Sequence, residues 1–284
     1  MMDADNALDW RLNAYRPDLA DIRLQGQVQA LRFVEGTSAR ISAAAAPLLR
    51  RPVDDAAMDS QLLHGENLSV FECQDGWAWV QSETDGYVGY LHESALSTTM
   101  PAPTHKIITG QTVVLSDREQ IAAPLHSLSL GAQVTVVEEG ERFHRLATGG
   151  FVFAAHLAPL DYYEDDWVAV AERFLGLPYL WGGRGYGGID CSGLVQVSLA
   201  LCGHAVLRDS DQQANTIGES IALDPSTWEH GDLLFTRGHV LIAHAGISVI
   251  HATGHRWSVV TEERNLVISS LYGKERPVIS ARRL

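Results

Sequence analysis

A cysteine in the second half of the chain lies in a setting that suits nucleophilic chemistry. Cys191 follows a stretch rich in glycine, residues 182–188, and precedes an apolar run, residues 194–201, that suits a helix buried on one side. Unpaired N–H groups at the start of a helix favour thiolate, the reactive form of cysteine. The local pattern fits a buried, inert cysteine about as well, so a partner base elsewhere must decide between the two.

Two histidines further along the chain can supply that base. His239 begins the apolar run 240–243, and His251 ends the run 248–250. If the two runs pair as strands, the imidazoles lie side by side, with His239 facing the sulfur and His251 at its far ring nitrogen. Either histidine alone would more often be structural, but their order and spacing after Cys191 predict a cysteine, histidine, histidine triad.

A metal site is the other use of such residues, because imidazole and thiolate both bind zinc. His244 and His255 could be added to the set, but no second cysteine pair is present, and Cys202 lies a full helix away from Cys191. We therefore expect neither a metal nor any other cofactor.

The composition narrows the class of partner. The chain has 284 residues, a net charge of -14, 46% hydrophobic and 20% charged residues, which is ordinary for a globular protein and argues against a general polyanion binder. We expect no nucleic-acid partner. No apolar run approaches 18 residues and no secretory signal is visible, so we expect no membrane partner. Three cysteines fit a reducing compartment, and we expect a cytoplasmic protein.

The first half of the chain shows short alternating runs that indicate strands of small barrels. The runs occur as two similar sets, which predict an internal repeat of about 60 residues: 68–72, 77–80 and 87–91 in the first, and 133–137, 143–146 and 150–153 in the second. From residue 162 a helix capped by Asp166, the glycine loop and the Cys191 helix precede several apolar strands, an α+β layout. We expect a lead-in over 1–27, all-β units over 28–100 and 101–160, and an α+β domain over 161–284.

Five ordered motifs in the last part of the chain resemble those of the NlpC/p60 papain-like cysteine peptidases. They are Leu177-Pro178-Tyr179-Leu180-Trp181-Gly182-Gly183, Asp190-Cys191-Ser192-Gly193-Leu194-Val195, Gly231-Asp232-Leu233-Leu234-Phe235, Gly238-His239-Val240 and Ile250-His251-Ala252. The all-β units resemble bacterial SH3 domains. The resemblance implies an α+β papain-like, NlpC-type catalytic domain preceded by two small SH3-like barrels.

The same resemblance implies roles for matching residues. Cys191 would be the nucleophile, His239 the general base and His251 the orienting residue. Six further residues would bind substrate: Asp190 and Ser192 beside the nucleophile, Ser210 and Trp181 lining the pocket, and Tyr87 and Asp59 from the first barrel, closing the amino-terminal end of the cleft. A carboxylate such as Asp190 could pair with a free amino group.

The implied activity is that of the cytoplasmic γ-D-glutamyl-L-diamino acid endopeptidases. The substrate would be a small peptide, L-Ala-γ-D-Glu-diamino acid, derived from peptidoglycan and recycled in the cytoplasm. Two alternatives remain open, because a triad does not fix a substrate: an inactive muropeptide-binding protein, and a papain-like amidase or acyltransferase acting on another amide.

Overall fold

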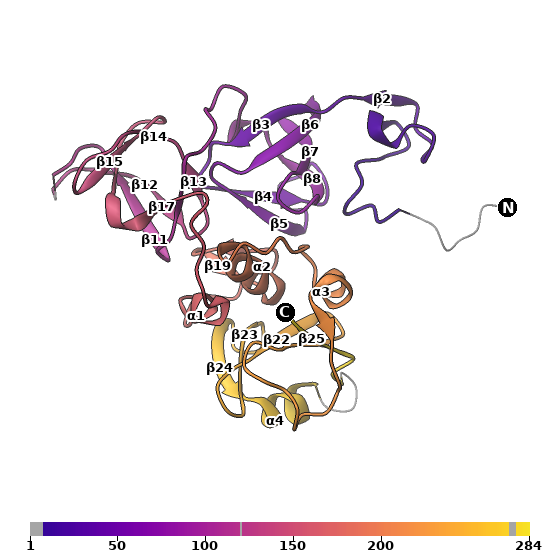
Figure 1. Cartoon of the computed structure of the whole chain (residues 1–284). Coiled ribbons are helices and arrows are strands. Elements are labelled where there is room, and N and C mark those ends of the chain that lie inside the picture. The colour runs from indigo at the N-terminus through magenta and orange to yellow at the C-terminus, as the bar shows by residue number, and fades with distance from the viewer. Residues whose placement is uncertain (1–7, 120, 273–276) are drawn as a thin grey trace. The chain divides into compact units, whose positions relative to one another are not determined.

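The computed structural model describes residues 8–119, 121–272 and 277–284, and its fold separates into two compact units. The first unit ends at Leu160 and the second begins at Asp161. Figure 1 shows the first unit in indigo to magenta, made almost entirely of strands, and the second in rose to yellow, with the described helices α1 to α4. Each unit is described separately below.

The first unit contains a seven-stranded antiparallel sheet in the order β5-β4-β8-β7-β6-β3-β9. Its strands are β3 (Thr37–Ile41), β4 (Ala45–Leu49), β5 (Met58–Leu63), β6 (Asn67–Gln74), β7 (Trp77–Ser82), β8 (Val88–His92) and β9 (Leu96–Ser97), with the short helix η2 (Glu93–Ala95) before the last. The three runs predicted here as strands are confirmed as β6, β7 and β8. Alternate residues of these strands, among them Leu68, Ala78 and Val80, point into one buried core.

A second group of strands follows in the same unit. It forms a three-stranded sheet, β13-β10-β17, and a five-stranded sheet, β12-β11-β16-β15-β14. The strands are β10 (His105–Ile107), β11 (Gln111–Leu115), β12 (Pro124–Ser129), β13 (Gln133–Val134), β14 (Val136–Glu138), β15 (Phe143–Leu146), β16 (Phe151–Phe153) and β17 (Leu157–Pro159), with η3 (Ala154–His156) before β17. The predicted runs 143–146 and 150–153 are confirmed as β15 and β16. The run 133–137, predicted as one strand, is divided into β13 and β14, which belong to different sheets. The β14-β15-β16 meander corresponds to β6-β7-β8, as the predicted repeat requires.

The two strand groups are joined by close backbone contact. Gly65 precedes β6 and Gly131 precedes β13, and both have φ above +80°, which glycine adopts without steric cost. A Cβ at Gly65 would lie 2.1 Å from the carbonyl oxygen of Gln133, so a larger residue cannot fit there. Strand β1 (Leu19–Asp21) and the short helix η1 (Ile22–Leu24) lie in the lead-in, and β1 pairs in parallel with β2 (Arg32–Val34), which lies within the predicted first all-β unit.

The second unit is built on a six-stranded antiparallel sheet in the order β20-β25-β21-β22-β23-β24. The strands are β20 (Glu219–Ser220), β21 (Leu233–Thr236), β22 (His239–Ala243), β23 (Ser248–Thr253), β24 (Ser258–Glu263) and β25 (Ser280–Arg283). The helices are α1 (Trp167–Glu172), α2 (Cys191–Leu201), α3 (Ser210–Thr216), α4 (Arg264–Leu266) and η4 (Val267–Tyr272), and a small hairpin joins β18 (Arg184–Gly185) to β19 (Gly188–Ile189). The predicted α+β layout is confirmed for this unit.

Helix α2 is the buried centre of the second unit. Ten of its eleven residues are buried, and it packs against β22 and β23 of the sheet and against α1. The prediction of a helix buried on one side is therefore wrong, because other elements enclose α2 on nearly every side. The helix ends at Leu201, and Gly203 follows with φ +86°, a conformation in which glycine commonly ends a helix.

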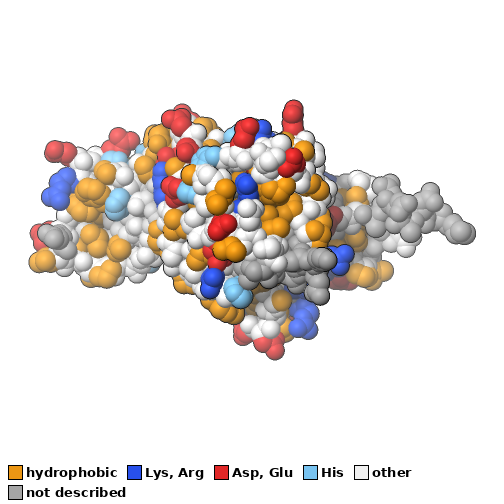
Figure 2. Space-filling model, turned by 90° about the horizontal axis from the view of Figure 1, so that it is seen from below, with side chains coloured by type: hydrophobic (Ala, Val, Ile, Leu, Met, Phe, Trp, Pro, Cys, Tyr) orange, Lys and Arg blue, Asp and Glu red, His pale blue; other side chains and the backbone are white. Residues whose placement is uncertain are grey.

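The surface is mixed in character. Figure 2 shows one face, on which acidic side chains are scattered among basic and apolar ones. No helix within the described parts of the chain is both long and apolar enough to cross a membrane.

Candidate active site

Cys191 is the first residue of α2, and the residue before it fixes the start of the helix. Asp190 is the N-cap, and its Oδ1 accepts a hydrogen bond of 2.7 Å from the N–H of Gly193. This cap satisfies one of the N–H groups that a helix leaves unpaired in its first turn. The glycine loop thus delivers the thiol to the helix start, as the sequence predicts.

The two predicted histidines lie on neighbouring antiparallel strands. His239 opens β22 and His251 lies within β23, whose register pairs Ala243 with Val249. Counting by twos from that pair puts both histidines on the same face of the sheet. Nε2 of His239 lies 2.9 Å from Nδ1 of His251, and both side chains are buried. The predicted pairing of the two imidazoles is therefore present.

The cysteine helix packs against the same strands. Contacts join α2 to β22 and β23, and the backbone of Val240, next to His239, forms a hydrogen bond with the thiol of Cys191. The structure thus brings the thiol to the strand that carries the predicted base.

The surroundings of the thiol oppose its ionisation. Burial is the largest effect, followed by the negative charge of Asp190, and together they raise the pKa of the Cys191 thiol to about 12. Hydrogen bonds from the backbone of Val240 and Ser192 offset this only in part. Whatever the helix terminus contributes, the pKa of the thiol lies above its usual value, because a buried thiol with a carboxylate beside it resists ionisation. A base must take the proton.

A carboxylate that the motifs did not indicate completes the histidine pair. Nε2 of His251 lies 3.0 Å from Oε2 of Glu262 on β24. His251 pairs with Val260 across the strands, and Glu262 is two residues further along the same face, within diagonal reach. Burial works to raise the pKa of Glu262, but hydrogen bonds from His251 and Arg256 outweigh it, so its pKa lies below the usual value. The sequence feature that could have indicated this contact is the short connection, residues 254–257, which makes the two strands neighbours.

Asp190 is also half of a buried ion pair that the sequence did not indicate. Arg208, 1% exposed at its side chain, donates to both carboxylate oxygens of Asp190 at 2.9 and 2.7 Å. The N–H of Gly182 donates to the same carboxylate at 2.8 Å. Asp190 therefore ties the glycine loop, the helix start and the segment before α3 together. Its role as a substrate contact stays a prediction.

Ser192 belongs to the same network. Its hydroxyl accepts a hydrogen bond of 2.9 Å from Arg208, and its carbonyl accepts one of 3.0 Å from the side chain of Gln213 on α3. The structure places Ser210 at the first position of α3, half-buried, and Trp181 in the glycine loop with 61% of its surface exposed. Pocket roles for Ser192, Ser210 and Trp181 stay predictions.

The two residues predicted from the first barrel lie in well-defined surroundings in the first unit. Tyr87 is 2% exposed and packs in the core of the seven-stranded sheet, and its N–H donates to the carboxylate of Asp85. Asp59 lies on β5 and accepts two hydrogen bonds from the guanidinium of Arg50, at 3.0 and 2.6 Å. Substrate contact by either residue stays a prediction.

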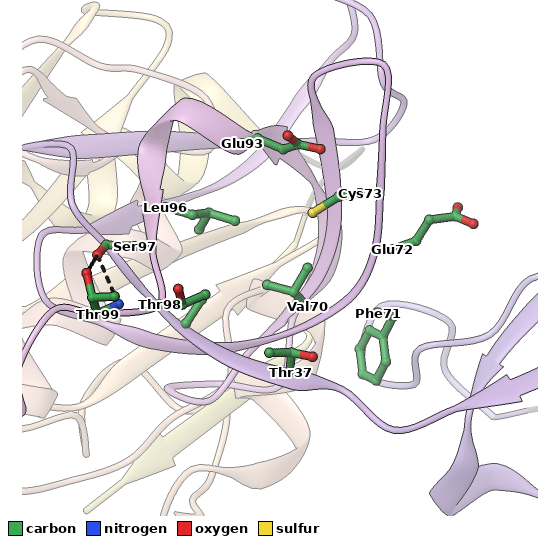
Figure 3. Close-up of a pocket in the computed structure, with 11 residues that line it drawn as sticks. Thr37, Val70, Phe71, Glu72, Cys73, Glu93, Leu96, Ser97, Thr98 and Thr99 are labelled. Atoms are coloured by element: carbon green, nitrogen blue, oxygen red, sulfur yellow. Dashed lines mark hydrogen bonds between the residues drawn. The ribbon is translucent and has the colours of Figure 1, made fainter.

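The first unit also has a pocket of its own. Its volume is about 560 Å³. Figure 3 shows residues that line it, among them Val70 and Cys73 of β6 and, further along the chain, Glu93 and the segment 96–99. Glu93 and Cys73 lie near each other at one end, and Ser97 and Thr99 are hydrogen-bonded at the other. None of the predicted site residues lines this cavity. Within the described residues, no three His, Cys, Asp or Glu side chains group in a way that could hold a metal ion.

Two known protein families match this chain, one in each of its two units. Residues 176–276 match the NlpC/P60 family, and residues 48–96 match the bacterial dipeptidyl-peptidase Sh3 domain. The resemblance to the NlpC/p60 peptidases that the five motifs indicated is therefore confirmed. The Sh3 match falls within the first predicted barrel, and a second SH3-like barrel over 101–160 stays a prediction.

Individual relatives agree with these matches. The γ-D-glutamyl-L-lysine dipeptidyl-peptidase of Bacillus subtilis strain 168 is 28% identical over 211 residues, which are 69% of this chain and 70% of that protein. Dipeptidyl-peptidase 6 of Lysinibacillus sphaericus is 26% identical over 241 residues, 76% of this chain and 88% of that protein. The crystal structure of an NlpC/P60 family protein from Bacillus cereus ATCC 10987 has the same fold, with a TM-score of 0.72 at 20% identity over 87% of this chain and 99% of that one.

Proposed function

We propose, with the NlpC/P60 match of residues 176–276 as the premise, that this chain is a cysteine peptidase acting on peptidoglycan-derived peptides. The bond to be cut joins the γ-carboxyl of D-glutamate to a diamino acid. One observation carries the proposal: Cys191 opens a helix packed on the two strands whose histidines, His239 and His251, are hydrogen-bonded at 2.9 Å. The name of the Bacillus subtilis relative, a γ-D-glutamyl-L-lysine dipeptidyl-peptidase, supports the class of bond.

The proposed reaction begins with a proton transfer. His239 takes the proton of the Cys191 thiol, and the thiolate attacks the γ-carbonyl carbon of the substrate. The N–H of Cys191, at the positive end of α2, is the proposed donor to the oxyanion. The His239 imidazolium then protonates the departing amine of the diamino acid, and water hydrolyses the thioester to release the γ-D-glutamyl product and the free thiol.

We further propose that the substrate carries a free N-terminal L-alanine. The prediction rests on Tyr87, Asp59 and Asp190, which would recognise the amine. A requirement for a free amine restricts the enzyme to peptides already trimmed from the wall, which suits recycling of murein peptides in the cytoplasm.

The test is incubation with L-Ala-γ-D-Glu-diaminopimelate followed by mass spectrometry of the products. We expect release of L-Ala-γ-D-Glu, with at least about a 10⁴-fold loss of rate in Cys191→Ala, as for removal of a nucleophile elsewhere. Cys202→Ala is the matched control and should retain the wild-type rate, because Cys202 ends α2 at the opposite terminus.

Three other outcomes would change the proposal. Cleavage of a different amide would favour an amidase or acyltransferase, and binding without cleavage would favour a muropeptide-binding protein. Equal rates on the N-acetylated peptide would reject amine recognition while leaving the triad in place.

A further inference from the structure

The hydrogen bonds behind His239 form a chain of three side chains whose direction can be worked out. Nε2 of His239 lies 2.9 Å from Nδ1 of His251, and Nε2 of His251 lies 3.0 Å from Oε2 of Glu262. An ionised carboxylate can only accept hydrogen bonds, whereas each nitrogen of a neutral imidazole either donates or accepts. The carboxylate at the end of the chain therefore determines the role of every nitrogen before it.

The first consequence concerns His251. Because Glu262 only accepts, Nε2 of His251 must carry the proton. A neutral imidazole has one proton, so Nδ1 of His251 is bare and accepts. Burial is the main reason that the pKa of His251 lies below its usual value, and the neutral ring is therefore the form present near neutral pH.

The second consequence concerns His239. Nδ1 of His251 accepts, so Nε2 of His239 must donate and must carry the proton of that ring. The remaining nitrogen, Nδ1 of His239, is then unprotonated. This is the only atom of the ring that can take a proton from a thiol.

We infer that Glu262 is a positioning residue that sets the tautomers of His251 and His239 and so makes Nδ1 of His239 the base for Cys191. Proton transfer then breaks the S–H bond of Cys191 and forms an N–H bond at Nδ1 of His239. The products are a thiolate and an imidazolium that donates to His251 from Nε2. The carboxylate of Glu262 stabilises that positive charge through the intervening ring.

The surroundings of Glu262 support a fixed direction. The side chain of His251 is fully buried, and that of Glu262 is 16% exposed, so water has little access to the bond between them. The other oxygen of Glu262 accepts a hydrogen bond of 3.0 Å from Arg256. An arginine at that oxygen keeps the carboxylate ionised and holds it in place.

The inference rests on the proposed function only in taking Cys191 as the nucleophile, and its test does not depend on the peptide that is cut. The variants are Glu262→Ala, which removes the acceptor, and Glu262→Gln, whose amide oxygen can still accept. Glu263→Gln is the matched control, because Glu263 is the next residue along and its side chain is exposed. The measurements are ¹⁵N chemical shifts of the histidine rings in the full chain and the rate of alkylation of Cys191 by iodoacetamide.

We expect both histidines of the wild type to be protonated at Nε2. In Glu262→Ala, His251 should shift toward the Nδ1–H form, and alkylation near neutral pH should slow by about tenfold to a hundredfold, the size typical of lost outer-shell partners. Glu262→Gln should lie between Glu262→Ala and the wild type, and Glu263→Gln should match the wild type. A residue that served only stability would leave tautomers and alkylation unchanged in the folded protein.

Two results would overturn the inference. One is a wild-type protein in which His251 carries its proton on Nδ1, and this measurement needs no variant to fold. The other is Glu262→Ala with wild-type tautomers and a wild-type alkylation rate. Failure of the proposed function can be distinguished from failure of this inference. In that case the tautomers and the alkylation rates would follow the expected order, but no γ-D-glutamyl peptide would be cleaved.

Discussion

The ion pair of Arg50 with Asp59 in the first unit and that of Arg208 with Asp190 in the second differ chiefly in the solvent exposure of the arginine. In both, the aspartate side chain is buried, 4% exposed for Asp59 and 9% for Asp190. The guanidinium of Arg50, however, is 55% exposed, whereas that of Arg208 is 1% exposed. An exposed arginine keeps its hydration, but a buried one loses it and must recover the free energy from hydrogen bonds.

The difference in exposure of the two arginines corresponds to a difference in what each ion pair holds in place. Arg50 binds the carboxylate of Asp59, nine residues away, and its guanidinium lies over the ring of Trp10, so both of these contacts stay within the first unit. Arg208 joins Asp190, Ser192 and the carbonyl of Gly183, and so holds the start of α2 and the glycine loop in one arrangement. Complete desolvation of a charged network is expected where the position of a side chain, here Cys191, must be fixed closely.

The largest effect should come from breaking the buried pair. We expect Arg208→Ala to lower the free energy of unfolding of the second unit by about 3–5 kcal/mol, because it leaves Asp190 as an uncompensated buried charge. Denaturant unfolding measures the loss, and amide hydrogen exchange in α2 assigns it to this unit. Arg208→Lys should recover only part of the stability, because lysine cannot form the two-pronged bond. An unchanged unfolding midpoint for Arg208→Ala would contradict the account of the buried network.

Arg256 is intermediate between Arg50, which is exposed, and Arg208, which belongs to a buried network. Its side chain is 56% exposed, much like Arg50, but its partner Glu262 leads to the buried histidines. Burial, opposed by Glu262 and supported by Arg256, lowers the pKa of His251. Within the part of the chain that the structure describes, the charged or titratable groups found to act on His251 are Glu262, Arg256 and His239.

We expect peptidase activity to be present at neutral pH and lost as the pH falls below the usual histidine value of about 6.5. The reason is that protonated His251 has no nitrogen left to accept from His239. In Arg256→Gln the lowering effect of the arginine is lost, the pKa of His251 rises, and the acid limb of the rate profile moves to higher pH. The pH dependence of kcat/KM measures this shift, with Arg51→Gln as the exposed control. A limb that stays in place, or moves to lower pH, would show that Arg256 does not act on His251.

The positions of the three proposed triad residues could be predicted from the sequence because each lies in a local motif. Cys191 follows a glycine loop and an N-cap aspartate, and His239 and His251 bound apolar runs of strand length. The strand order needed to bring the histidines together follows from a hairpin, the simplest antiparallel connection.

The supporting residues could not be predicted in the same way. Arg208 is an arginine with no exposed surface, a placement that composition never suggests for a charged residue. The role of Glu262 depends on the register between β23 and β24, and a shift of one residue would turn it to the opposite face. The raised pKa of Cys191 depends on the burial of the thiol and on the position of the Asp190 charge. Neither can be worked out from the position of the cysteine at a helix start.

The smallest effect should come from the exposed pair. We expect Arg50→Ala to change the free energy of unfolding of the first unit by no more than about 1 kcal/mol, because its guanidinium stays largely in water in the folded protein. The loss should shrink further at 1 M salt, where the Debye length falls to about 3 Å. Denaturant unfolding at low and high salt measures both values. A salt-independent loss as large as that of Arg208→Ala would mean that Asp59 behaves as a buried charge like Asp190, and the contrast between the two units would then lie in their partners rather than in desolvation of the arginine.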